Sequence, residues 1–184
     1  MMQSYKALGA LTWTIALTAV ACGSYDESSG LIEMGGTGAL PDIRINELMA
    51  RNPSGSDWIE LYNSADREVS LAGYYVSDTA DALYRARLPV EAVVPAEGFL
   101  VLYADDDTTQ GGLHLGFKLS GDGEGVWLTS ADGRIVDSVT FGSDGPAGSS
   151  YARYPDGGDV DVDGTWEWCS TPTQGRSNGE GCEP

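Results

Sequence analysis

Hydrophobic and polar positions alternate over short stretches from Asp42 onward, and clusters of turn-forming residues separate these stretches. Ile43 and Ile45 alternate with Arg44 and Asn46, which is the period-two pattern of a strand with one buried face. Similar reasoning predicts strands near residues 57–62, 69–76, 99–103, 126–128 and 135–141. No stretch after residue 41 keeps a helical period, so the pattern predicts strands throughout.

Two of these stretches allow a more specific prediction. Ile59 and Leu61 point to one face of their strand, which puts Glu60 on the polar face. Residues 99–103 (FLVLY) lack alternation, which predicts burial on both faces.

Turn-forming sequences lie between the predicted strands. Asp132-Gly133 is the strongest hairpin signal, because this dipeptide readily adopts the positive φ angles of a tight turn. The other turn signals are Asn52-Pro53-Ser54-Gly55, Pro95-Ala96-Glu97-Gly98, Pro155-Asp156-Gly157-Gly158 and Gly121-Asp122-Gly123-Glu124-Gly125, the last expected to be a hairpin turn. About seven or more short strands with frequent turns predict an all-β, two-sheet sandwich.

Composition supports a folded domain and excludes some partners. Of the 184 residues, 41% are hydrophobic and 21% are charged, which is enough for a core and too little charge for general disorder. The formal net charge is -18, from 28 Asp and Glu against 10 Lys and Arg, and this disfavours binding to DNA or RNA. The single histidine, His114, excludes a metal centre built from several histidines.

The N-terminal segment is typical of an export signal. One positive charge in Met1–Lys6 precedes an apolar run at Ala7–Val20, which is shorter than the roughly 20 residues that span a bilayer. Ala19-Val20-Ala21-Cys22 then resembles the lipobox of bacterial lipoproteins, which implies cleavage before Cys22 and a lipid on that cysteine. The alternative is an ordinary signal peptide followed by an incidental cysteine. We expect residues 1–21 to be the signal peptide and residues 22–41, rich in Gly and Ser, to be a lipid-attached flexible tether.

The cysteine count agrees with a lipid on Cys22. Three cysteines are an awkward number for an exported protein in an oxidising compartment. If Cys22 is acylated, Cys169 and Cys182 remain, and a disulfide between them would hold the polar tail on the domain. Free thiols or a metal pair are the alternatives.

A series of segments follows one another in a recognisable order: Ile45–Ala50, Asn52-Pro53, Asp57–Asn63, Val69–Asp78, Pro95–Val101, Phe117–Ser120, Gly125–Leu128, Asp132-Gly133, Val136–Val139, Ser150–Gly157, Thr171-Pro172 and Asn178. This series resembles the lamin-tail domain family over about residues 42–178 and leaves 179–184 as a C-terminal tail. The resemblance implies an immunoglobulin-like β-sandwich and no set of catalytic residues. In bacteria it implies a secreted or surface accessory module. The Cys169–Cys182 pair and the acidic loop before it look like local additions.

Candidate catalytic residues are sparse. His114 lies in a strand-like stretch without an accompanying Gly-x-Ser-x-Gly sequence, and a cross-strand or edge position explains it. Asp57 and Glu60 would act as a glycosidase-like pair only in a cleft that separates their pKa values, which spacing does not establish. The acidic run at 105–107 is expected to be a solvated turn, with metal binding as the alternative.

An acidic loop at 159–164 (DVDVDG) has the strongest chemical signal. Asp159, Asp161 and Asp163 stand at alternate positions before a glycine, which matches the first half of a calcium-binding loop. Ser170 stands where such a loop carries a bidentate Glu, and Glu167 could contribute instead. The alternative is a solvated acidic loop.

Two tryptophans share one face of a predicted strand. Trp166 and Trp168 flank Glu167, so both indoles point to the same side if the segment is extended. Stacking on a sugar ring or a peptide is one interpretation, and core packing or the covering of a sheet edge is the other.

We expect a non-catalytic binding or structural module, exported and tethered by lipid to the bacterial cell envelope, that contacts a protein or a glycan. It requires no cofactor, does not bind nucleic acid and has a monomeric head. Gly23 follows Cys22 in place of the Asp that holds enterobacterial lipoproteins at the inner membrane, which favours the outer membrane or the cell surface. The alternative is a Ca²⁺-dependent accessory domain or hydrolase subunit that uses the acidic loops.

Overall fold

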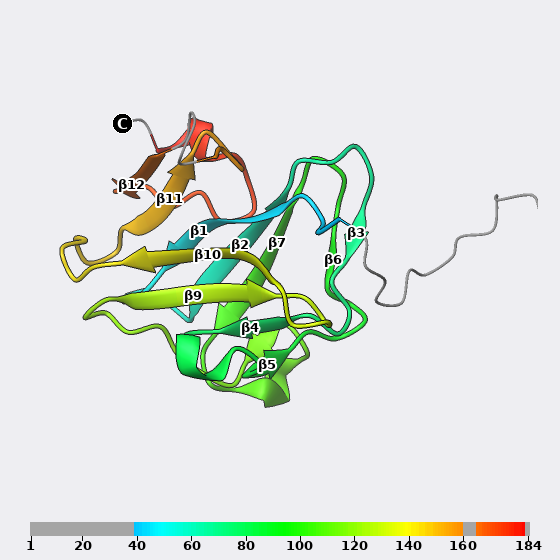
Figure 1. The fold of residues 1–184 in the computed structure, drawn as a ribbon. Coiled ribbons are helices and arrows are strands. Elements are labelled where there is room, and N and C mark those ends of the chain that lie inside the picture. The colour runs from blue at the N-terminus through cyan, green and yellow to red at the C-terminus, as the bar shows by residue number, and fades with distance from the viewer. Residues whose placement is uncertain (1–38, 160–164, 183–184) are drawn as a thin grey trace, which may run out of the picture. The chain divides into compact units, whose positions relative to one another are not determined.

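Residues 39–159 and 165–182 are described in the computed structural model, and they form a β-sandwich (Figure 1). The larger sheet has six strands in the order β12-β11-β1-β2-β7-β8, and the smaller has four in the order β10-β9-β4-β5. β3 and β6 form a separate two-stranded ribbon. None of the described segments forms an apolar helix long enough to cross a bilayer.

The strands are β1 (Ile43–Met49), β2 (Asp57–Asn63), β3 (Val69–Ser70), β4 (Tyr75–Ser77), β5 (Ala86–Arg87), β6 (Val93–Val94), β7 (Phe99–Ala104), β8 (His114–Leu115), β9 (Glu124–Thr129), β10 (Ile135–Phe141), β11 (Ser150–Tyr154) and β12 (Thr165–Cys169). Short 3₁₀ turns occur at η1 (Ala80–Ala82), η2 (Thr108–Gln110) and η3 (Asn178–Glu180). Neighbouring strands are antiparallel, except that β8 runs parallel to β7.

The core lies between the two sheets and is built from the alternating apolar positions. Leu48, Ile59 and Leu102 are neighbours across β1, β2 and β7 and are fully buried. Val126 and Leu128 of β9 are fully buried on the inner side of the four-stranded sheet, which lies in front of β1, β2 and β7 in Figure 1. The all-β, immunoglobulin-like sandwich expected from the sequence is therefore confirmed.

The stretch at 69–76 is not the single strand that its composition predicts. β3 pairs with β6, whereas β4 pairs with β5 and β9, so the two ends belong to different sheets. Between them, Gly73 has a φ of 83°, and the N–H of Tyr74 donates to the carbonyl of Leu71. The left-handed conformation at Gly73, which glycine adopts readily, turns the chain out of the ribbon and into the four-stranded sheet.

Most of the predicted turns join the expected strands. Residues 52–55 connect β1 to β2, and Asp132-Gly133 connects β9 to β10 with a φ of 88° at Gly133. Residues 121–125 are an exception, because this turn leads from β8 of the larger sheet to β9 of the smaller one. The expectation of a hairpin at that point is therefore wrong.

β7 has one buried face, and the expectation of two is wrong. Leu102 is fully buried in the core, whereas Phe99 and Tyr103 are partly exposed on the outer side. There Phe99 packs against Tyr62 and Tyr103 against His114, with ring centroids 4.9 and 4.8 Å apart. Aromatic contacts on a half-exposed face produce the same continuous apolar run as burial on both faces would.

A buried ion pair ties β10 to the larger sheet. The register of β1 against β2 shifts between Ile45 and Glu47, which leaves the β1 backbone irregular at this point. Asp137 of β10 accepts from the N–H of Ile45 and from Arg153, both at 2.8 Å. Arg153 of β11 is only 3% exposed and also donates to the carbonyl of Ile45 at 2.9 Å. The two side chains therefore satisfy backbone groups that the β ladder leaves open.

Removal of Asp137 should strongly destabilise the domain. In an Asp137→Ala variant the buried guanidinium of Arg153 loses its counter-charge, which we expect to lower the free energy of unfolding by about 3 kcal/mol or more. Urea unfolding followed by tryptophan fluorescence measures the change. The control is Thr140→Ala, at an exposed position of the same strand, which should cost less than about 0.5 kcal/mol. Equal stabilities of the two variants would contradict this account of the β10 attachment.

Candidate functional site

The C-terminal strap, residues 170–182, lies against the outer face of the six-stranded sheet. Its contacts converge on Glu47 of β1 and Glu60 of β2, which are cross-strand partners. Both residues are fully buried although they face away from the core. Because a buried carboxyl group needs hydrogen-bond partners, the strap and these two acids depend on each other for their positions.

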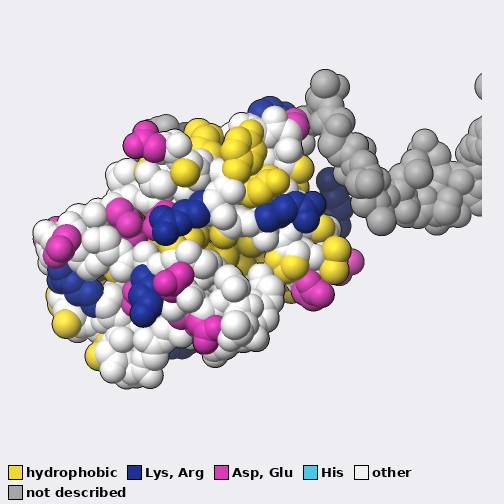
Figure 2. Space-filling model, turned by 90° about the horizontal axis from the view of Figure 1, so that it is seen from below, with side chains coloured by type: hydrophobic (Ala, Val, Ile, Leu, Met, Phe, Trp, Pro, Cys, Tyr) yellow, Lys and Arg dark blue, Asp and Glu magenta, His cyan; other side chains and the backbone are white. Residues whose placement is uncertain are grey.

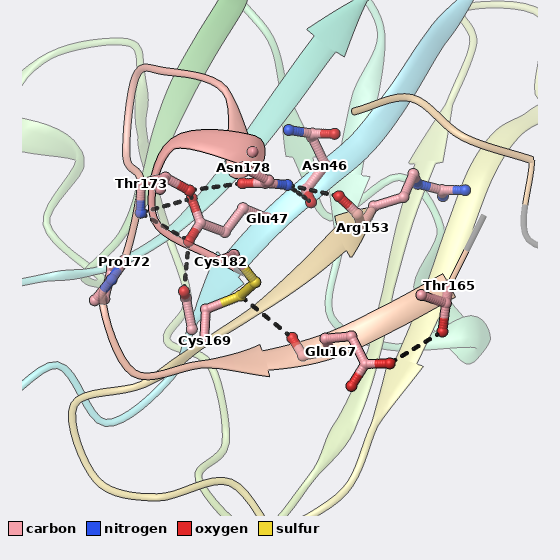
Figure 3. The surroundings of a disulfide bond; sticks show 12 residues. Asn46, Glu47, Arg153, Thr165, Glu167, Cys169, Pro172, Thr173, Asn178 and Cys182 are labelled. Atoms are coloured by element: carbon pink, nitrogen blue, oxygen red, sulfur yellow. Dashed lines mark hydrogen bonds between the residues drawn. A yellow bond between two sulfur atoms is a disulfide. The ribbon is translucent and has the colours of Figure 1, made fainter. Parts of the chain in front are cut away.

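Glu47 accepts hydrogen bonds from the strap and from β11. Thr173 donates its N–H at 3.0 Å and its hydroxyl at 2.9 Å, and the hydroxyl of Ser150 also donates to this carboxyl group. Burial raises the pKa of Glu47, while these hydrogen bonds and the charge of Arg176 oppose the rise. Figure 3 shows Thr173 directed at the Glu47 carboxyl group beside the disulfide.

Glu60 is held in a similar way. The N–H of Gly175 donates to its Oε2 at 2.5 Å, and the side chain of Asn46 donates to its Oε1 at 3.2 Å. Burial raises the pKa of Glu60 to about 8, opposed by these two hydrogen bonds and assisted by the charges of Glu47 and Asp156. The alternation predicted for β2 is right, but the strap covers its outer side. Glu60 therefore lies on the polar face of β2, as expected, but that face is buried under the strap.

Two asparagines and an aspartate complete the cluster. Asn178 of the strap donates to the carbonyls of Asn46 at 3.1 Å and Arg153 at 2.8 Å, and its own side-chain oxygen lies 2.6 Å from the hydroxyl oxygen of Thr173. Asp156 accepts from the side chain of Asn46 at 2.9 Å and from the N–H of Asn178 at 3.0 Å. We call this partnered group the buried clasp; its members are Asn46, Glu47, Glu60, Asp156, Thr173 and Asn178.

The strap ends in a disulfide. Cys169 of β12 and Cys182 lie at bonding distance, with Cα atoms 5.0 Å apart, and each is 3% exposed. They pack with Ala152 of β11 in a small apolar cluster apart from the main core. The structure thus brings together the two cysteines whose pairing we expected, and Figure 3 shows the bond between β12 and the strap.

Asp57 and Glu60 do not form an acid pair. They stand an odd number of positions apart on β2, so their side chains leave the sheet on opposite faces. Asp57 accepts from the N–H of Asn52 at 3.0 Å, and burial raises the pKa of Asp57. Because the sheet separates the two carboxyl groups, no substrate bond can lie between them as glycoside hydrolysis requires.

His114 lies on the edge strand β8, as expected, and pairs with Asp105. Its Nδ1 is 2.7 Å from Oδ2 of Asp105, and its ring stacks on Tyr103. The same Asp105 oxygen accepts from Ser56 at 3.0 Å and from Gln110 at 3.2 Å. Because Ser56 donates to the carboxylate and not to the imidazole, Ser56, His114 and Asp105 do not form a nucleophilic triad.

The acidic run at 105–107 is the expected solvated turn at Asp106, which is exposed, but not at Asp105, whose side chain is only 9% exposed. Burial acts to raise the pKa of Asp105, but hydrogen bonds from His114, Asp107 and Ser56 outweigh this effect and hold the pKa below its ordinary value. Asp107 caps η2 by accepting from the side chain and the N–H of Thr109, and these bonds lower the pKa of Asp107. Asp105 and Asp107 therefore hold this loop in place through hydrogen bonds. Because their carboxyl oxygens already have these partners, the structure gives no support to metal binding here.

A hollow of about 360 Å³ lies beside this loop. Gly55, Ser56, Asp57, Ala104, Asp105 and Lys118 line it. Ser56 is bonded to Asp105, and Asp57 is bonded to the turn that precedes it. The walls of the hollow are thus polar, and its two carboxyl groups, Asp57 and Asp105, already accept hydrogen bonds from the 52–56 turn.

Trp166 and Trp168 lie on one face of β12, as the alternation predicts. Tyr151 packs against both indoles, with ring centroids 5.1 and 4.8 Å apart. The guanidinium of Arg153 lies 4.9 Å from the Trp166 ring centroid, and the ring of Trp168 covers Gly145. Each indole thus has two packing partners at the edge of the six-stranded sheet, which favours packing over ligand stacking.

Several predicted site residues lie outside the described residues. They are Cys22, the expected lipid attachment site, and Asp161 and Asp163 of the acidic loop. Asp159 is described and exposed. Within residues 39–159 and 165–182, no group of three or more His, Cys, Asp or Glu side chains is placed to hold a metal ion. Calcium binding by the acidic loop stays a prediction.

The buried clasp has only a weak signature in the sequence. Asn46 and Glu47 are adjacent polar residues, whereas strict alternation after Ile45 and Asn46 would place an apolar residue at position 47. The register shift between Ile45 and Glu47 is the structural form of that irregularity. Thr173 and Asn178 carry no such signal, because they lie in a segment without periodicity.

Comparison with known families gives one match. A family model described as the lamin tail domain matches residues 37–143, which include β1 to β10. The matched region ends at residue 143, whereas the resemblance noted in the sequence extends to residue 178. The segments that follow the matched region are β11, β12, the strap and the disulfide. No curated protein matches the chain.

The free energy of unfolding should fall as the pH rises from about 4.5 to about 8. In the unfolded chain the carboxyl group of Glu60 has its ordinary pKa of 4.5, whereas in the folded domain Glu60 stays protonated up to about pH 8. Unfolding between these two pH values therefore releases a proton from Glu60. One such proton gives a slope of about 1.4 kcal/mol per pH unit at most. Urea midpoints measured between about pH 5.5 and about pH 8.5 test this, and we expect Glu60→Gln to flatten the slope. The exposed control Glu91→Gln should keep it, and a wild-type stability that rises over this range would contradict the assignment.

Calcium binding by Asp159, Asp161 and Asp163 predicts a higher melting temperature in Ca²⁺ than in chelator. A ligand that binds only the folded state adds about 2.7 kcal/mol at about a hundredfold excess over its Kd. Thermal melts in millimolar Ca²⁺ and in chelator measure the shift. Joint replacement of Asp161 and Asp163 by Asn should abolish it, while Asp122→Asn, at a side chain that is 97% exposed, should not. Identical wild-type melts would make the three acids a solvated loop.

Proposed function

The chain belongs to the lamin tail domain family, and on this premise we propose that it is a non-catalytic binding or structural module of the bacterial cell envelope. A lipid on Cys22 holds the chain at a membrane, and residues 22–41 tether the domain to it. The domain contacts a protein or a glycan of the envelope and acts as a monomeric head.

The state of the buried acids is the observation that carries the non-catalytic part of this proposal. A raised pKa, such as that of Glu60, is typical of catalytic acids, but it also arises in structural clusters. Glu47 and Glu60 are fully buried beneath the strap and accept hydrogen bonds from it. An acid that transfers a proton must come within hydrogen-bond reach of its substrate. The clasp therefore uses these carboxyl groups to hold the chain together.

The N-terminal sequence supports the location. The positive start, the short apolar run and Ala19-Val20-Ala21-Cys22 follow the order of a lipoprotein export signal. A cysteine that carries more than one acyl chain binds a membrane stably, whereas a single chain is marginal. Gly23 after the cysteine favours the outer membrane or the cell surface over the inner membrane.

The charge of the chain supports the choice of partners. A net charge of -18 repels the phosphates of nucleic acids and of other strongly acidic polymers. Proteins and glycans of the envelope are the partners that remain for a domain without a catalytic arrangement among its described residues.

Cys22→Ala should release the protein from membranes. Without a thiol at residue 22 no lipid can be attached, so the protein should move from the membrane fraction to the soluble fraction of fractionated cells. Labelling with an alkyne analogue of palmitate should mark the wild type and leave the variant unmarked. Ser24→Ala is the matched control, since it changes a neighbouring residue and keeps the cysteine. An unchanged membrane fraction for Cys22→Ala would refute the anchor, and turnover of ester, glycoside or phosphodiester substrates by the pure protein would refute the non-catalytic role.

A further inference from the structure

The outer face of the four-stranded sheet presents an uncharged row of side chains. Val126 and Leu128 of β9 point into the core, so Gly125 and Trp127 point outward. Trp127 pairs across the sheet with Ser77 on β4 and with Ser138 on β10, and Gly125 pairs with Thr140. We call this row the Trp127 face; it consists of Ser77, Gly125, Trp127, Ser138 and Thr140. Ser77 and Gly125 are buried, so its accessible side chains are those of Trp127, Ser138 and Thr140.

The indole of Trp127 lies flat along its own strand. A Cβ atom at Gly125 would stand 2.7 Å from Cζ3 and 2.8 Å from Cζ2 of Trp127, and would also meet Cη2. The six-membered ring therefore rests on the Gly125 backbone, where a side chain would displace it. Trp127 remains partly exposed. The domain thus holds one aromatic ring in a single orientation, so that little rotational freedom is lost when a flat ligand stacks on it.

Hydroxyl groups border the indole on the β10 side. Ser138 and Thr140 are both exposed, and they alternate with the buried Val139. At the next outward position of β9 is Thr129, which is fully buried, and its hydroxyl has no hydrogen-bond partner. A buried hydroxyl without a partner is uncommon, but its burial keeps the Thr129 hydroxyl out of reach of a ligand, so Ser138 and Thr140 are the hydroxyls available on this side.

Aromatic side chains extend the face beyond the indole. Tyr75 pairs with Thr129 and meets Tyr84 edge to face, with ring centroids 5.0 Å apart. Tyr84 is 59% exposed, and Ile135, the other cross-strand partner of Thr129, is 48% exposed. Figure 2 looks at the domain from below Figure 1, toward the edge at β5, and there Lys, Arg, Asp and Glu side chains surround the hydrophobic ones.

We propose that the Trp127 face binds a neutral saccharide, with a sugar ring stacked on Trp127 and its hydroxyls bonded to Ser138 and Thr140. The C–H groups of a sugar ring carry positive partial charge and complement the negative face of an indole, while hydroxyl groups both donate and accept hydrogen bonds. The absence of charge from this row matches a neutral ligand, although the chain carries 28 acidic residues. The exposed hydroxyls of Ser138 and Thr140 beside the indole favour a saccharide over a protein, because protein interfaces have a more apolar centre. The inference rests on the proposed binding function and does not depend on the lipid anchor.

The test uses the full chain, purified in a detergent without a sugar head group. The probes are laminarin, xylan oligosaccharides and chitin oligosaccharides, with the anionic polysaccharide alginate for contrast. Titration calorimetry and tryptophan emission should report binding of at least one neutral probe and no binding of alginate. Trp127→Ala should weaken that binding by about tenfold or more, as loss of a central aromatic contact does. Trp166→Ala is the matched control, because it removes a partly exposed indole from the other sheet and should leave the affinity unchanged.

Gly125→Ala tests whether binding requires the indole of Trp127 to lie flat on the Gly125 backbone, or only requires a tryptophan nearby. The added Cβ must lift the indole off the backbone, so this variant should lose affinity as Trp127→Ala does while it keeps every tryptophan. Thermal melts of all variants identify any loss that comes from unfolding.

Three results would overturn the inference. They are binding of none of the neutral probes, binding that survives Trp127→Ala, and self-association that Trp127→Ala abolishes without any sugar binding. Failure here, together with release from membranes by Cys22→Ala, would leave the proposed function standing with a protein as partner.

Discussion

The burial of two carboxyl groups on neighbouring strands is the constraint on which the larger sheet depends. Glu47 and Glu60 face each other across β1 and β2, and neither reaches water. Such groups are tolerated only when donors surround them, and here the donors include Thr173 and Gly175 of the strap. The strap in turn has its backbone and side-chain groups satisfied by the acids and by Asn46. The C-terminal segment is therefore an integral part of the fold, although it follows the region that the family model matches.

The strap makes the two faces of the sandwich different. The six-stranded sheet is covered on its outer side where β1 and β2 lie, and the disulfide and the aromatic packing on β12 close its far edge. On the outer side of the four-stranded sheet, Trp127 is partly exposed and Ser138 and Thr140 are exposed. Asp137 and Arg153 lock β10 against the bulge in β1, so this open sheet is held rigidly to the closed one. Rigid sheets position a binding surface better than loops do.

Perturbed acids in this domain have structural causes. The raised pKa of Glu60 follows from its burial under the strap, and the lowered pKa of Asp105 from the hydrogen bonds that fold its loop, which outweigh its burial. Both shifts are explained by contacts within the fold and do not by themselves indicate catalysis. What the domain offers instead is surface: a net negative chain with one uncharged, partly aromatic row on its open sheet. The saccharide binding that we propose would use that row.

Local patterns determined much of this protein from the sequence alone. The alternation around Ile45 and Leu61, the Asp132-Gly133 turn and the order of segments specified an all-β sandwich of the lamin tail domain family, because strand period and turn chemistry are properties of neighbouring residues. The tertiary structure decided what lies above each face. Glu60 has the pattern of a surface residue and becomes buried only because a segment more than a hundred positions later folds over it. Such long-range cover leaves no period in the sequence, since it depends on which distant groups the chain brings together and not on the residues beside them.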